Sequence, residues 1–276
     1  MEKMGEESKA VIRTLFVWIV FVGLLLVWFP ILAVIRLFDR DPVHYRSGRF
    51  YRSMAKPLVK LIPIWRLIFT GEKNLPLRRP YVVVSNHQSL LDIPIIAYMG
   101  MEMKWVAKKE LFSVPLLGWM MSLADDIKLD RSQARSGVQA MIRARKCLQA
   151  DYPVVFFPEG TRSRDGRVHA FSDGPFHLAI KAGALILPLA IEGANECIPK
   201  NSWRFGPPRD VHIHVFPPLP TAGYTLKQAG ELQERVRRMI VEQIAVWRQA
   251  APEAVDGLVK PEQPATTENE RTSPNR

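Results

Sequence analysis

The longest apolar run in the chain lies close to its amino terminus. Between Arg13 and Arg36 there are 22 residues without a charged side chain. A helix of this length rises roughly 33 Å, which is enough to cross the hydrocarbon core of a bilayer. A secretory signal peptide is the alternative, but the run is long and no small-residue cleavage site follows it. We therefore expect a membrane helix or, because Pro30 can bend it, a hairpin that lies in one leaflet.

A second apolar stretch, at residues 57–69, is too short and too charged to span a bilayer. Lys60 and Arg66 lie among its large apolar residues, a pattern that favours a helix at the membrane interface, with a core helix as the alternative. Together the two stretches predict an N-terminal membrane-anchoring segment at residues 1–69. Residues 36–60 hold seven basic side chains and two aspartates, which predicts an inner-membrane protein with the rest of the chain on the cytoplasmic side.

Short apolar runs alternate with amphipathic segments over residues 70–250. Four runs have the length and composition of strands: 81–85, 153–157, 185–191 and 211–216. Three segments have helical spacing or helix-end signals: 132–150, 175–182 and 226–249. Strands that alternate with helices predict an α/β fold, with a mixed, partly parallel sheet flanked by helices. Residues 251–276 hold four prolines and almost no large apolar side chains, so we predict a disordered tail there.

Composition narrows the class of protein. Residues 1–250 hold 35 basic and 22 acidic side chains, a net charge of +13. This excess favours an anionic partner, which is nucleic acid, a phospholipid headgroup or a phosphorylated metabolite. A nucleic-acid binder does not explain the uncharged amino-terminal run. Two cysteines without a CxxC motif exclude a disulfide scaffold, give no sign of a zinc cluster and indicate a reducing compartment.

The first motif that carries chemistry is the segment 85–92, at the end of the predicted strand 81–85. His87 and Asp92 are five residues apart, so they would lie roughly 140° apart on a helix and on opposite faces of a strand. They meet only if the chain turns between them. Asp92 would then fix the imidazole tautomer and leave the other ring nitrogen as a general base. The alternative is that Asp92 caps a helix and His87 makes an ordinary hydrogen bond at the strand end.

The second motif, at residues 156–164, follows the predicted strand 153–157. It contains Glu159, Gly160, Thr161 and Arg162. Guanidinium groups bind phosphate bidentately, and glycine lets backbone N–H groups approach an anion closely. The alternative is a polar turn that ends in the dipeptide at 165–166, a common hairpin signal. Because both motifs follow strands, they are expected at the carboxyl edge of the sheet, where ligands of α/β proteins bind.

Together the two motifs resemble those of the 1-acyl-sn-glycerol-3-phosphate acyltransferases, glycerolipid acyltransferases that make phosphatidic acid. His87 and Asp92 match the family's histidine–aspartate block, and 157–163 matches its acceptor-binding block. Residues 106–119 with 129–131 resemble the second block, and 186–193 resemble the last. The likeness covers roughly residues 70–220 in the family's order, which makes it specific. It implies a glycerol-3-phosphate acyltransferase-like fold for an acyltransferase domain at residues 70–250.

The resemblance also implies a reaction. A fatty acyl group would pass from acyl-CoA or an acyl carrier protein to the sn-2 hydroxyl of lysophosphatidic acid, at the membrane phospholipid surface, to give phosphatidic acid. His87 would act as general base, oriented by Asp92. Six residues would bind the acceptor and its phosphate: Glu159, Gly160, Thr161, Arg162, Lys108 and Arg131. No metal, no cofactor beyond the thioester co-substrate and no nucleic acid is expected.

Two segments depart from the family pattern, and other classes of protein fit the sequence less well. An acid stands at 173, where a lysine-rich stretch is common, and 125–128 is charged where glycine and apolar residues are usual. Glycerol 3-phosphate or another lysophospholipid is therefore the alternative acceptor. A serine hydrolase based on Ser89 lacks a GxSxG elbow, and the other histidines lack metal-ligand spacing. The non-enzyme alternative is a membrane-surface lipid-binding protein in which His87 is structural.

Overall fold

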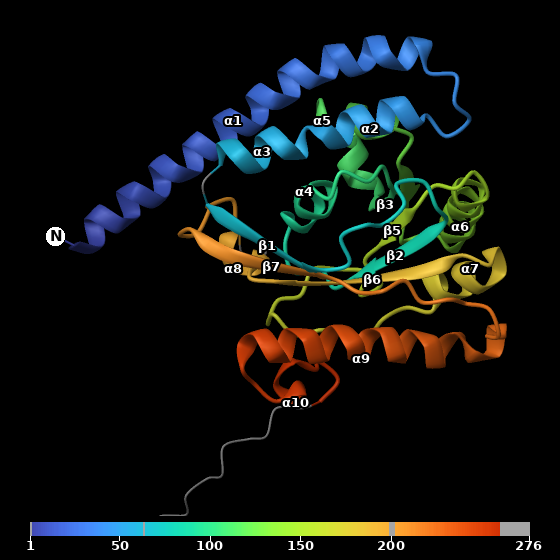
Figure 1. The fold of residues 1–276 in the computed structure, drawn as a ribbon. Helices are drawn as coiled ribbons and strands as arrows, with labels where there is room; N and C mark the ends of the chain where they lie inside the picture. Colours follow the sequence, from blue (N-terminus) through green and yellow to red (C-terminus); the bar gives the residue numbers. More distant parts are fainter. Residues whose placement is uncertain (1, 63, 199–201, 260–276) are drawn as a thin grey trace, which may run out of the picture.

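The computed structural model describes residues 2–62, 64–198 and 202–259, which form an α/β/α sandwich beneath a long amino-terminal helix (Figure 1). The strands of its sheet are β1 (Trp65–Gly71), β2 (Tyr81–Ser85), β3 (Lys104–Lys108), β4 (Ile127–Leu129), β5 (Val154–Phe156), β6 (Leu185–Glu192) and β7 (Arg209–Val215). The α-helices are α1 (Glu2–Phe38), α2 (Tyr45–Ser53), α3 (Ala55–Leu61), α4 (Asp92–Ala97), α5 (Leu117–Leu123), α6 (Ala134–Gln149), α7 (Gly174–Ala182), α8 (Ala194–Cys197), α9 (Ala229–Arg248) and α10 (Pro252–Val255). Two 3₁₀ helices, η1 (Lys109–Ser113) and η2 (Leu226–Gln228), complete the elements of this part of the chain.

The strands form one sheet in the order β1-β7-β6-β2-β5-β3-β4. The strands β6, β2, β5, β3 and β4 all run parallel, β7 is antiparallel to β6, and β1 is parallel to β7. The predicted mixed, partly parallel sheet is confirmed. Five neighbouring strands therefore present their carboxyl ends at one edge, which is where the predicted site lies.

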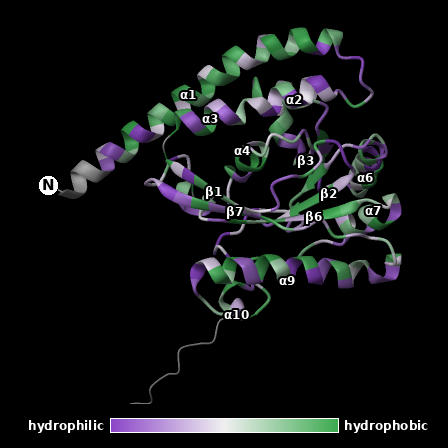
Figure 2. Ribbon diagram, in the orientation of Figure 1, coloured by the Kyte–Doolittle hydropathy of each residue, from purple (hydrophilic) through white to green (hydrophobic). Residues whose placement is uncertain are grey.

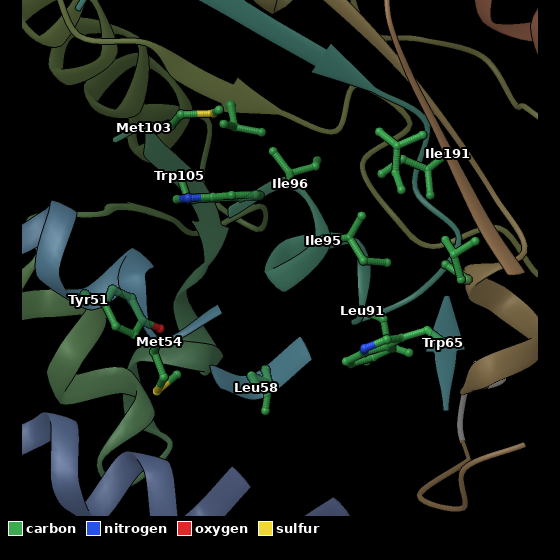
Figure 3. Packing of buried hydrophobic residues seen from close by; sticks show 14 of the residues in the cluster. Tyr51, Met54, Leu58, Trp65, Leu91, Ile95, Ile96, Met103, Trp105 and Ile191 are labelled. Carbon is green, nitrogen blue, oxygen red and sulfur yellow. The ribbon is translucent and has the colours of Figure 1, made fainter. Parts of the chain in front are cut away.

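Each face of the sheet is covered by its own layer of helices. Successive residues of β2 point to opposite faces, so that Val83 belongs to one core and Val82 and Val84 to the other. The first core packs against the helices α1 to α5, and Figure 3 shows Tyr51, Met54 and Trp105 among its members. The second core packs against α6, α7 and α9. Burial on both faces explains why β2 is a run of valines and not an alternating strand.

α1 is one 37-residue helix with Pro30 in its interior, so the hairpin bent at Pro30 is not formed. The chain turns after α1, and α2 and α3 run back alongside it (Figure 1). One side of α1 is buried against the domain at Val17, Leu24 and Leu32. Large apolar side chains are exposed along the other side, including Ile12, Leu15, Phe16, Ile19, Val22, Leu26, Val27, Ile31, Val34, Leu37 and Phe38. Figure 2 shows this apolar character along most of α1, and residues 7–38 are long and apolar enough to cross a membrane.

The prediction of an interfacial helix over residues 57–69 is wrong for its second half, from residue 65 onward. Residues up to 61 belong to α3, but Trp65–Gly71 is the edge strand β1, paired with β7 along its whole length. Leu67, Ile68 and Phe69 suit a helix or a strand equally by spacing, and pairing with β7 decides between them.

The tail predicted to be disordered from residue 251 folds over its first part. α10 packs on α9, and Val255 is fully buried. Arg237 of α9 binds Asp256 at 2.8 Å, and Asp256 bridges to Val168. Residues 260–276, the rest of the predicted tail, lie outside the described residues.

Four buried charged side chains join α2 to the β3–β4 edge of the sheet. Arg52 of α2 forms an ion pair with Asp126, which precedes β4. Lys104 at the start of β3 contacts Glu102 at 2.8 Å and donates to the Ala124 carbonyl at 2.8 Å. All four charged groups are buried, and removing one member of such a set costs several kcal/mol because its partner stays charged and unpaired. The cluster fixes how the amino-terminal helices sit on the sheet.

Gly48 of α2 lies directly over this cluster, where a β-carbon would overlap the Glu102 carboxylate. We predict that Gly48→Ala lowers the free energy of unfolding by about 3 kcal/mol, because the ion cluster must move to admit the methyl group. Urea unfolding in detergent measures this. The matched control is Gly137→Ala on α6, where nothing lies within 4 Å and stability should hold or rise by about 0.5–1 kcal/mol. Equal stabilities of Gly48→Ala and wild type would contradict this packing of α2.

Candidate active site

The sheet topology brings the two motifs together. β2 pairs with β5, with Val84 opposite Phe156, so His87 is level with Glu159 in the segments that follow these strands. Lys108 ends β3, and Arg131 comes two residues after β4. All the residues proposed from the sequence therefore lie at the carboxyl edge of the parallel strands.

The turn predicted between His87 and Asp92 is present. Asp92 is the first residue of α4, and its Oδ2 atom accepts a hydrogen bond from His87 Nδ1 at 2.7 Å. The same oxygen accepts the backbone N–H groups of Gln88 at 2.8 Å and Ser89 at 2.9 Å. Asp92 is fully buried, so these three donors replace the water that Oδ2 would otherwise bind. A carboxylate at Nδ1 fixes the proton there and leaves the Nε2 lone pair of the neutral ring for proton transfer.

The imidazole is also held by its face. The His87 ring stacks on Phe157, with the ring centroids 4.0 Å apart and the planes 16° from parallel. Phe157 in turn lies 6.0 Å from the ring of Trp105 on β3. The side chain of His87 is 14% exposed, so the ring is largely buried while part of it remains accessible. Packing and hydrogen bonding thus leave the ring one orientation.

Glu159 has a place that the sequence did not predict. Its Oε1 accepts the backbone N–H of His87 at 2.8 Å, and its Oε2 accepts that of His169 at 3.1 Å. The backbone N–H of Ser163 donates to the His87 carbonyl at 2.7 Å. The second motif therefore holds the main chain of His87 on both sides. Both carboxylate oxygens of Glu159 thus accept hydrogen bonds from the chain's own amides, and acceptor binding by Glu159 stays a prediction.

The other proposed binding residues lie around these contacts of Glu159 and Ser163 with the main chain of His87. Gly160 has a φ of 72°, in the left-handed region that favours glycine, with open space where a β-carbon would stand. Thr161 is exposed and Arg162 half-buried in the same loop. Lys108, which contacts Glu110 at 3.6 Å, and the exposed Arg131 lie beyond β5, at the ends of β3 and β4. Direct contacts thus join His87, Asp92 and Glu159, while Lys108 and Arg131 share only the sheet edge with them.

Sequence reasoning missed a set of polar residues on the other side of His87. The Asn86 side chain pairs with the Ile191 backbone through two hydrogen bonds of 2.9 Å. The Gln88 amide donates to Glu192, the last residue of β6, at 2.8 Å. Glu192 also binds Arg248 at the end of α9. These contacts were missed because the partners of Glu192 are distant in the chain. The sequence signal for Glu192 was its place inside the last family block.

Within residues 2–62, 64–198 and 202–259, no group of three or more His, Cys, Asp or Glu side chains could hold a metal ion.

The fold and the site agree with one class of protein. A family model described as Acyltransferase matches residues 66–192, a range that contains β2 to β6, β1 from its second residue, His87, Asp92 and the whole second motif. The crystal structure of the 1-acyl-sn-glycerophosphate acyltransferase PlsC from Thermotoga maritima has a TM-score of 0.71 with this chain and 26% identity. The match covers 87% of this chain and 98% of the PlsC chain.

Relatives narrow the class further. The chloroplastic 1-acyl-sn-glycerol-3-phosphate acyltransferase LPAT1 of Arabidopsis thaliana is 35% identical over 182 residues, which are 65% of this chain and 50% of the relative. The 1-acyl-sn-glycerol-3-phosphate acyltransferase alpha of Mus musculus is 30% identical over 242 residues, 87% of this chain and 81% of the relative. The chain belongs to this 1-acyl-sn-glycerol-3-phosphate acyltransferase family. It spans about half the length of the curated plant relatives from Brassica napus and Arabidopsis thaliana.

The buried position of Glu159 predicts that the free energy of unfolding depends on pH. Burial raises the pKa of Glu159 from 4.5 to about 7, although its two backbone hydrogen bonds lower it. The folded protein then takes up a proton that the unfolded chain has lost, so stability falls as the pH rises through this window. Between about pH 5 and about pH 8 the wild type should lose on the order of 2 kcal/mol relative to Glu159→Gln.

Urea unfolding of both proteins across this pH range measures the difference. Glu242→Gln, on the exposed surface of α9, is the control for removing one carboxylate. A constant difference between wild type and Glu159→Gln at all pH values would show that Glu159 stays ionised in the fold.

Proposed function

We propose that this protein transfers a fatty acyl group from a thioester to the sn-2 hydroxyl of lysophosphatidic acid, giving phosphatidic acid for phospholipid synthesis. The observation that carries the proposal is the 2.7 Å contact of His87 Nδ1 with the buried Asp92, which directs the opposite ring nitrogen to substrate. The names of the relatives supply the acceptor. Glycerol 3-phosphate or another lysophospholipid is the alternative acceptor, and acyl-CoA and acyl carrier protein are alternative donors.

The reaction needs one base. His87 Nε2 removes the hydroxyl proton as the oxygen attacks the thioester carbonyl, and Asp92 stabilises the imidazolium that forms. The C–S bond then breaks, and the thiolate takes the proton from His87. A C–O bond has replaced the C–S bond, the imidazole is neutral again, and no acyl-enzyme forms. Positioned proton removal of this kind contributes about 10²–10⁴-fold to the rate.

The loop after Glu159 suits the phosphate of the acceptor. Gly160 has open space where a β-carbon would stand, so an anion can approach the loop closely, and Thr161 and Arg162 offer a hydroxyl and a guanidinium fork. Lys108 and Arg131, which lie one and two strands beyond β5, are further candidates for the same charge. Glu159, proposed from the sequence as part of the acceptor site, also fixes the loop and the main chain of His87.

We also propose that the exposed side of α1 holds the protein in one leaflet of an inner membrane, with the catalytic domain on the cytoplasmic side. α1 is bound to the domain at several points along its length. Arg13 donates to the Phe205 carbonyl at 3.1 Å, the Trp18 indole to the Trp203 carbonyl at 3.1 Å, and the Trp28 indole to Ser53 at 3.3 Å. A helix packed on its own domain in this way supports lying in the membrane surface over spanning it.

The proposed reaction predicts the effect of two substitutions. His87→Ala should abolish thiol release from oleoyl-CoA with lysophosphatidate in detergent, because no other group takes the hydroxyl proton. Asp92→Asn should lower the rate about 10³–10⁴-fold, because an amide favours the wrong imidazole tautomer. His177→Ala, on α7, is the control for losing a histidine and should keep the wild-type rate.

The outcomes separate the alternatives. Release that needs an acceptor and is lost with His87 supports acyl transfer, and exchange of the acceptor then identifies it. Release that ignores the acceptor indicates a thioesterase. No release with oleoyl-CoA or an acyl carrier protein donor, together with vesicle binding that His87→Ala leaves intact, would favour the lipid-binding alternative.

The proposed membrane contact predicts that charges on the exposed side of α1 release the protein. Ile19→Glu combined with Leu26→Glu should reduce flotation with phosphatidylglycerol-containing vesicles at least roughly tenfold, because both side chains would enter the apolar region. Val246→Glu, an equally exposed apolar position on α9 beyond the opposite face of the sheet, is the control. Unchanged flotation of the double variant would remove α1 as the lipid contact.

A further inference from the structure

Arg248, the last residue of α9, reaches the site edge from the layer opposite to the His87 ring. α9 packs on the second core, below the sheet in Figure 1, whereas Phe157 under the imidazole packs on the first core. The Arg248 guanidinium binds both oxygens of Glu192 at 2.8 Å. Its Nη2 also donates to the Gly166 carbonyl at 2.7 Å. One side chain thus holds the end of β6 and the turn at the end of the second motif.

The Glu192 contact continues to Asp92. Glu192 Oε2 accepts the Gln88 amide at 2.8 Å, and the backbone N–H of Gln88 donates to Asp92 Oδ2 at 2.8 Å. Gln88 is buried, so its side chain has no water to replace Glu192. The orientation of the residue beside His87 therefore depends on a carboxylate that Arg248 keeps in place.

The Gly166 contact continues to the main chain of His87. The turn at 163–167 is closed by Ser163, whose hydroxyl donates to the Arg167 carbonyl at 2.8 Å and whose N–H donates to the His87 carbonyl at 2.7 Å. Gly166 has a φ of 74°, and a β-carbon there would stand 3.3 Å from Arg248 Nη2. Arg248 therefore lies against this turn as well as bonding to it.

We propose that Arg248 is a positioning residue for the acyl transfer: through Glu192 and the Gly166 carbonyl it fixes the two loops that hold His87. This inference rests on the proposed function. A guanidinium fork suits the role because it binds a planar carboxylate bidentately and still donates to a third acceptor. Without it, the Glu192 carboxylate, 15% exposed, stays charged beside Gln88 and must turn toward water.

The expected effect is on turnover. Arg248→Ala should lower kcat about 10–100-fold and change the KM for lysophosphatidate less than threefold, because displacement of a reacting group by about 1 Å costs up to about 10²-fold. Arg248→Lys, which keeps the charge but loses the fork, should fall between Ala and wild type. Glu192→Gln should behave like Arg248→Ala, and the double variant should be no worse than the worse single variant, because both act on one path.

Arg237 provides the matched control. It lies on the same helix, is buried, and binds Asp256 and Glu234 at distances of 2.8–3.0 Å. It also donates to the Val168 carbonyl at 3.5 Å, but none of these contacts is to Glu192, Gly166 or residues 85–92. Arg237→Ala should lower the melting temperature and leave kcat within twofold of wild type below that temperature. If Arg237→Ala and Arg248→Ala lose kcat equally at equal loss of stability, Arg248 only stabilises the fold and the inference is overturned.

A spectroscopic readout separates this inference from the reaction itself. The proton on His87 Nδ1, bonded to a carboxylate, should give a strongly deshielded NMR resonance that His87→Ala removes. Arg248→Ala and Glu192→Gln should shift or broaden this resonance, and Arg237→Ala should not. If the wild type shows no thioester turnover but the resonance still changes in Arg248→Ala, the proposed reaction is rejected and the positioning role of Arg248 is kept. An unmoved resonance in Arg248→Ala would reject the positioning role alone.

Discussion

The site depends on the burial of one charge, the carboxylate of Asp92. A carboxylate without water must collect donors, and here one oxygen accepts three N–H groups from residues 87, 88 and 89. That demand bends the chain directly after β2 and sets the start of α4. The imidazole is the third donor, so the need that shapes the loop also selects the tautomer a base requires. Structure and reactivity in this loop have the same cause.

The rest of the site holds the loop from outside. Glu159 accepts the backbone N–H of His87, and Ser163 donates to the His87 carbonyl. The Asn86 side chain binds the backbone of Ile191 and so extends the pairing of β2 with β6. These contacts come from β5 on one side of β2 and from β6 on the other. The central position of β2 in the sheet therefore matters as much as the motif, because only a central strand has a neighbour on each side to supply them.

Much of the fold was predictable where local pattern and tertiary environment agree. Buried strands such as Tyr81–Ser85 are continuous apolar runs, and Gly183 ends α7 in the left-handed conformation expected of it. Predictions failed where an element is short or has charged ends. β4 has three residues, β3 begins and ends with lysine, and β1 is defined by its pairing with β7. Such strands exist because of their neighbours, which periodicity does not show.

The contact of His87 with Asp92 was predictable because both residues are in one turn. The role of Glu159 was not, since its partners are backbone amides 72 and 10 residues away and amides have no sequence signature. The same holds for Arg248 and Glu192, which lie 56 residues apart. Family resemblance marks such residues as important without giving their partners.

The way His87 is held has a practical consequence. Its position is set through its own backbone N–H and carbonyl, which every amino acid except proline possesses, whereas the contacts to Phe157 and Asp92 involve the ring. The surrounding residues therefore hold the main chain at position 87, and the side chain there can be exchanged without losing those backbone contacts. A substitution of His87 by a side chain that cannot accept a proton should therefore leave the surrounding loops in place. Under the proposed function, an inert protein of this kind would hold donor and acceptor side by side without consuming them, as crystallography of the ternary complex requires.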